Sequence, residues 1–112
     1  MIEKTILDYL NENASVPCYM ERPEKKPTSP YILIEKTGSR RANLITSSTF
    51  AIQSYAGTLY GAAQLNEEAK ALMDNLRVLP EVSASKLNSD YNFTNTADKQ
   101  YRYQAVYVVT HY

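Results

Sequence analysis

The chain has 112 residues with 12 basic and 12 acidic side chains, so its formal net charge is zero. This length fits one domain with a hydrophobic core, and we expect residues 1–112 to form a single α+β domain. The neutral balance excludes a protein that binds nucleic acid through its whole charged surface. Ten tyrosines beside two phenylalanines and no tryptophan are the unusual feature of the composition.

The cysteine and hydropathy patterns bear on the compartment. Cys18 is the only cysteine, so no intramolecular disulfide can form, which is typical of a reducing environment. Residues 1–10 include charged side chains and lack the apolar core of a signal peptide. No apolar run approaches the roughly 20 residues of a membrane helix, so no membrane association is expected.

The first third of the chain predicts a helix, a strand and a loop. Apolar residues within 2–10 recur at helical spacing, and polar residues at 11–13 end this short amphipathic helix. Residues 16–20 alternate as in a strand, which Pro17 restricts to a strand start or a sheet edge. Residues 22–30 contain three prolines and no aliphatic side chain, which predicts a loop.

The middle of the chain predicts two strands and the longest helix. Residues 31–36 form a buried strand, residues 37–43 a polar loop, and residues 44–56 a strand rich in serine and threonine. Thr58 is a candidate N-cap for a helix over residues 59–78, in which apolar residues recur three and four positions apart: Leu65, Ala69, Leu72 and Leu76. Pro80 prevents its continuation.

The last third predicts a weak strand over 82–87 and a hairpin formed by 91–94 and 100–111, with a turn at 96–99. The element order is then α-β-β-β-α-β-β-β. It favours an α+β fold with a short N-terminal helix and one long helix packed on a mostly antiparallel sheet.

Both faces of the final strand are partly apolar, so we expect it to be covered on both sides. The long helix would form one cover. A neighbouring subunit or another part of this chain would form the other, since tyrosine is enriched at interfaces.

The inventory of reactive side chains argues against an enzyme. One histidine, His111, and one cysteine, Cys18, do not make a metal cluster or a supported nucleophile–base pair. Three glycines leave no phosphate-binding loop. Glu67 and Glu68 are adjacent on the long helix and look like a solvated face. We expect no catalytic residue, no cofactor and no metal.

Charge is distributed unevenly. Residues 22–41 carry six basic and two acidic side chains, whereas residues 1–21 have a net charge of −3. A basic segment of this kind suits a complementary patch on a partner or on another copy, or it consists of ordinary solvated loops. A nucleic-acid contact through Arg40 and Arg41 is a further alternative, although no aromatic residue adjoins them for stacking.

The final third resembles a known family. The segments Ser89-Asp90-Tyr91-Asn92-Phe93-Thr94 and Lys99-Gln100-Tyr101-Arg102-Tyr103-Gln104-Ala105 are similar to the C-terminal hairpin of tail-terminator (tail-completion) proteins. These proteins belong to long-tailed phages and prophages of Gram-positive bacteria. The resemblance extends weakly to the front half, through Val16-Pro17-Cys18-Tyr19 and Pro30-Tyr31-Ile32-Leu33-Ile34-Glu35.

The resemblance implies a structural virion protein with an α+β fold. Family members form a hexameric ring on the tail tube and dock the head-completion protein. It thereby implies three partners, namely further copies of this chain, the tail-tube protein and the head-completion protein. It also implies assembly in the bacterial host cytoplasm and a final location at the head–tail junction of the virion.

Six residues are the candidate contacts: Arg40, Arg41, Asn43, Tyr101, Arg102 and Tyr103. A head–tail connector or minor capsid protein remains an alternative, as does a small nucleic-acid-binding regulator that uses residues 22–41. Direct nucleic-acid binding is the less favoured of these.

Overall fold

A computed structural model describes residues 1–23, 30–95, 97 and 100–112 of the chain. Its elements follow in the order α1 (Ile2–Asn13), β1 (Cys18–Tyr19), β2 (Tyr31–Ala42), β3 (Ile45–Ala56), α2 (Leu59–Asp74), the 3-10 helix η1 (Leu76–Val78), β4 (Val82–Asn92) and β5 (Tyr101–His111). The strands form one sheet in the order β1-β2-β3-β5-β4, in which only the β1–β2 pair is parallel. The predicted α+β fold is therefore confirmed.

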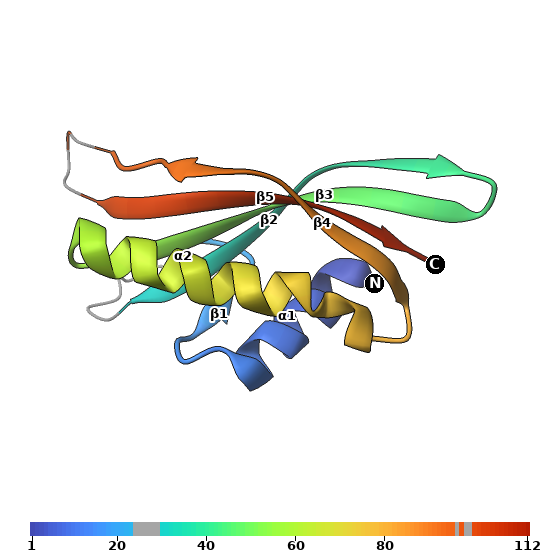
Figure 1. Cartoon of the computed structure of the whole chain (residues 1–112), viewed down its shortest axis with the longest axis horizontal. Helices are drawn as coiled ribbons and strands as arrows, with labels where there is room; N and C mark the ends of the chain where they lie inside the picture. Colours follow the sequence, from blue (N-terminus) through green and yellow to red (C-terminus); the bar gives the residue numbers. More distant parts are fainter. Residues whose placement is uncertain (24–29, 96, 98–99) are drawn as a thin grey trace.

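Both helices lie on one face of the sheet (Figure 1). Their buried side chains meet those of alternate strand residues in a continuous core that contains Ile6, Leu10, Ile34, Phe50, Ile52, Leu65, Ala69, Met73, Tyr107 and Val109. We call this the helix face of the sheet, and the other the open face. The molecule measures 44 × 25 × 24 Å. Its accessible surface of 6686 Å² exceeds the roughly 6,200 Å² expected of a compact monomer of this mass.

The N-terminal helix docks its end onto the first strand. Ile6 and Leu10 are fully buried, and the Tyr9 hydroxyl donates to the Leu72 carbonyl oxygen at 2.9 Å. The Asn11 side chain bonds both the N–H and the C=O of Cys18, which holds β1 beside the helix. The strand itself spans two residues at the sheet edge, directly after Pro17, so the predicted edge position is confirmed.

The long helix begins as predicted but ends earlier. Thr58 caps it, because its hydroxyl accepts the Gly61 N–H at 2.9 Å. The α-helix stops at Asp74, and residues 76–78 form the tighter η1 instead of the predicted last turn. Because Met73 enters the core, Leu72 is only half-buried.

The predicted loop over residues 37–43 is wrong for residues 37–42, which are strand, and only Asn43 lies in a turn. Strand β2 continues through them to Ala42 and pairs with β3 along its length, with one bulge between Lys36 and Gly38. The pattern misled because every residue of β2 from Glu35 onward is exposed, so no apolar alternation marks it as a strand.

The prediction of separate strands over 82–87 and 91–94 is also wrong. Strand β4 is continuous and pairs antiparallel with β5, with bulges at Val82/Ala84 and Leu87/Ser89, so the described residues form a sheet of five strands. The bulges interrupt the alternation from which a single strand would be recognised. The terminal hairpin is confirmed. Most of its predicted turn at 96–99, and residues 24–29 of the predicted proline-rich loop with Lys25 and Lys26, lie outside the described residues.

Candidate interaction surfaces

The outer part of the β2–β3 hairpin, residues 37–49, forms what we call the arm (Figure 1). Asn43 and Leu44 make its two-residue turn, and both have positive φ, at 52° and 67°. Such turns match the right-handed twist of the strands that they join, so Ala42 can pair directly with Ile45. The exposed outer half of β2 thereby reaches one end of the molecule.

The structure places Arg40, Arg41 and Asn43 together on this arm, all exposed. Arg40 and Asn43 border a shallow concave surface of about 560 Å³, whose other lining residues are Ala42, Ile45, Ser47, Thr49 and Val108. Arg41 follows Arg40 in the strand and therefore faces the opposite side. Neither arginine forms an ion pair with any described residue.

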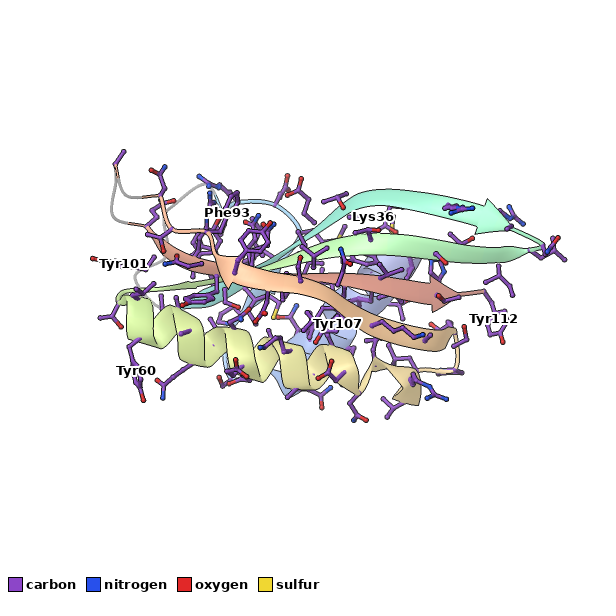
Figure 2. The ribbon with its side chains drawn as sticks, turned by 45° about the horizontal axis from the view of Figure 1, so that its top comes forward. Lys36, Tyr60, Phe93, Tyr101, Tyr107 and Tyr112 are labelled. Carbon is purple, nitrogen blue, oxygen red and sulfur yellow. The ribbon has the colours of Figure 1, made fainter. Side chains whose placement is uncertain are left out.

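Tyr101, Arg102 and Tyr103 lie at the other end of the sheet. Tyr101 pairs with Ala56, the last residue of β3, whereas Arg41 pairs with Thr46 near its start. Ten residues of strand separate the two positions by roughly 30 Å. The six predicted contact residues thus form two groups of three, one at each end of the sheet. Tyr101 lies at the end of the sheet remote from the arm in Figure 2.

Arg102 differs from its tyrosine neighbours because it belongs to the open face. Its guanidinium carbon lies 4.3 Å from the centre of the Phe93 ring, and its Nε donates to the Phe93 carbonyl oxygen at 2.6 Å. Its Nη1 also donates to the Tyr55 hydroxyl at 2.8 Å. Arg102 is thus held by its own chain, and Tyr101 and Tyr103 are half-buried towards the helix face.

A cluster of tyrosines on the open face was not predicted. Tyr31 and Tyr55 stack with ring centres 4.6 Å apart, and Tyr19 packs edge-on against Tyr31. The Tyr55 hydroxyl donates to Gln53 Oε1 at 2.9 Å. Burial raises the pKa of the Tyr31 hydroxyl above its ordinary value. Three strands contribute these side chains, so sequence spacing alone did not reveal the cluster.

The final strand is covered by α2 on one side, as predicted. Tyr107, which is labelled in Figure 2, is fully buried there. Its hydroxyl donates to Asp74 Oδ1 at 2.6 Å. Burial is the main cause that raises the pKa of the Tyr107 hydroxyl, and the hydrogen bond to Asp74 raises this pKa further. On the open face, Val106 and Val108 are half-buried, and none of the described helices covers them. The second cover of this strand is therefore not supplied by those helices.

Two lysines form ion pairs with carboxylates of the same chain. Lys36 Nζ of the basic segment lies 3.2 Å from Glu3 Oε2 of the acidic N-terminal segment. Lys70 on α2 lies 2.7 Å from Asp90 Oδ2 on β4. The hydrogen bond between them raises the pKa of Lys70 and lowers that of Asp90. Arg40 and Arg41 therefore carry the basic character of the arm.

The structure also separates the reactive side chains. Cys18 pairs with Ile32, which pairs with Ser54, whereas His111 pairs with Thr46, so seven residues of β3 lie between the two positions. Cys18 is buried, and burial together with the Glu68 charge raises its pKa to about 11. His111 Nε2 lies 2.9 Å from the Ser48 hydroxyl. These two residues do not form a nucleophile–base pair.

Glu68 does not belong to a solvated face, contrary to the sequence interpretation, although Glu67 does. Glu68 is half-buried and accepts the Ser15 N–H at 2.7 Å and the Ser15 hydroxyl at 2.8 Å. It lies in a shallow groove of about 410 Å³, which we call the helix groove. The residues that line this groove are Ser15, Val16, Pro30, Ala56, Gly61, Gln64, Leu65 and Glu68. The available sequence signal for the partial burial of Glu68 was its position three residues after the buried Leu65.

The structure thus defines an α+β protein whose sheet has both helices on one face. None of its described helices has the length and apolarity that a membrane crossing requires. A scan against protein-family models finds no matching family, and a search of curated proteins finds no relative.

Proposed function

We propose that this protein is a structural subunit of a phage tail, a tail terminator whose copies form a hexameric ring. The ring would cap the tail tube and offer a docking surface to the head-completion protein. The chain would assemble in the bacterial host cytoplasm and end at the head–tail junction of the virion. The resemblance of the terminal hairpin, whose two strands are β4 and β5, supports this proposal.

One structural observation carries the proposal furthest: the two ends of the elongated sheet are unlike. The arm end carries Arg40 and Arg41, and the other end carries the tyrosines of early β5 and the helix groove. A ring built from one kind of chain requires such heterologous contacts, in which one surface meets a different surface of the next copy.

Electron microscopy of the purified chain mixed with a tail-tube protein of the same genome would test this function. We expect rings alone or at the ends of tubes, and tubes of limited length. Failure to bind the tube protein in any preparation would contradict the proposal.

The same preparations distinguish the alternatives. Capture by a portal protein in place of the tube protein would identify a head–tail connector. Salt-sensitive binding of DNA or RNA that disappears on replacing Arg40 and Arg41 would identify a nucleic-acid-binding protein.

A further inference from the structure

Leu44 combines two unusual properties at the tip of the arm. Its φ of 67° lies in the left-handed region, where the Cβ of an L-residue approaches the following carbonyl oxygen. Glycine is the residue that a two-residue turn prefers at this position. Its side chain is also 79% exposed. A strained backbone that presents an apolar side chain to water is costly for a free surface, and such strain is concentrated at functional sites.

The surroundings of Leu44 are basic. Residues 37–49 contain two arginines and no acidic residue. Both arginines are exposed and lie within four residues of Leu44, so a partner for the tip needs an apolar hollow close to carboxylates.

The helix groove has this character, and it lies at the opposite end of the same strand. Val16, Pro30, Ala56 and Leu65 provide its apolar lining, and among the described residues that line it Glu68 is the charged one. Acidic side chains adjoin it on the side of α1 and β1, where residues 8–21 contain three acidic side chains and no basic one. Residues 22–30, which lead to Pro30, contain three basic side chains and one acidic one.

We propose that the tip of one copy docks in the helix groove of the next. Leu44 inserts between the apolar side chains, and one arginine of the arm, Arg40 or Arg41, faces Glu68. The tip and the groove lie at opposite ends of β3, so each copy can use both at once and the contact repeats from copy to copy. This inference deepens the proposed ring and rests on it for the biological setting.

Site-directed cross-linking tests the contact directly. A Leu44→Cys copy is mixed with a Gln64→Cys copy, because Gln64 is an exposed lining residue of the groove. The matched control replaces Gln64→Cys with Val78→Cys, which is 61% exposed on η1 and lies outside the groove. Cys18 stays in place because it is buried. We expect mild oxidation to give at least a five-fold higher yield of the 44–64 disulfide than of the 44–78 disulfide. Equal yields, or no disulfide in either mixture, would overturn the contact.

A second variant removes the anchor without weakening the fold. Leu44→Gly produces the Asn-Gly sequence that this turn favours, so the unfolding midpoint should not fall. An excess of wild-type chain should suppress the 44–64 disulfide, and an equal excess of Leu44→Gly chain should suppress it several-fold less. Equal competition would show that the Leu44 side chain does not anchor the contact.

These outcomes are separable from those for the proposed function. A specific 44–64 disulfide in a chain that ignores the tail-tube protein would retain the contact and remove the tail-terminator function. Rings that bind tubes without forming this disulfide would retain the tail-terminator function and remove the proposed contact.

Discussion

The inner and outer halves of the β2–β3 hairpin have the same backbone pairing but different environments. In the inner half, Ile34 and Ile52 pair directly and are almost fully buried under the helices. In the outer half, Arg41 pairs with Thr46, and the β2 residue is exposed. Strand pairing in this hairpin therefore continues beyond the core, and burial determines where a substitution affects folding. The following predictions test that difference.

The largest effect is expected in the inner half. Phe50→Ala should lower the free energy of unfolding by about 3–5 kcal/mol, because Phe50 is fully buried and its removal leaves a cavity. Ile45→Ala in the arm should cost less than about 1 kcal/mol, since Ile45 is 43% exposed. Urea denaturation measures both. Similar costs would mean that the arm is as well packed as the core.

A smaller effect is expected on the open face. Tyr55→Phe should cost about 1–3 kcal/mol, because Gln53 and Arg102 would lose their hydrogen bonds to a hydroxyl in a largely buried site. Tyr60→Phe is the control, as Tyr60 is 74% exposed and should tolerate the change. If both substitutions were neutral in urea denaturation, water would be able to replace the partners of Tyr55.

Much of the fold outside the arm could be predicted from the sequence, because the sequence signals for its elements are local. Thr58 capping, the helical spacing of Leu65 and Ala69, and the edge position after Pro17 each depend on neighbouring residues. The β3 side of the arm was predicted within the strand over residues 44–56. The β2 side escaped prediction because it is held by cross-strand hydrogen bonds, which leave no mark on hydropathy when the residues are exposed.

The candidate surfaces were predicted only in part, for a related reason. Arg40, Arg41 and Asn43 could be named together because they are adjacent in the chain. The stacking of Tyr31 on Tyr55 and the contact of Ser15 with Glu68 join residues that are distant in sequence. Nothing in the spacing of these residues indicates that they meet.

Partly exposed ion pairs should contribute less to the free energy of unfolding than the buried side chains of the core. Asp90→Asn removes the carboxylate that lies 2.7 Å from Lys70, and we expect a cost of about 0.5–1 kcal/mol at pH 7 because both groups are partly exposed. The folded-state pKa of Asp90 is lowered, so its contribution is present above the unfolded pKa of roughly 3.9 and is lost as pH falls through the folded value.

Urea midpoints measured between pH 7 and pH 2 would check this pH dependence. The difference between wild type and Asp90→Asn should shrink below about pH 4. Glu67→Gln is the control, because Glu67 also contacts Lys70 but its side chain is 72% exposed. A difference that stays constant down to pH 2 would contradict an ionic contribution from Asp90.

The smallest effect compares two basic residues of strand β2. Lys36 is paired with Glu3, and their side chains are 33% and 19% exposed, whereas Arg41 has no ion pair with any described residue. Lys36→Met should therefore lower the free energy of unfolding by up to about 1 kcal/mol, and Arg41→Met should change it by less than about 0.5 kcal/mol. Since salt screens an exposed pair more than a buried one, 1 M NaCl should narrow this difference only in part. An Arg41→Met chain that is destabilised more than Lys36→Met in urea would mean that the arm depends on Arg41 to keep its fold, and the distinction between the two halves of the hairpin would fail.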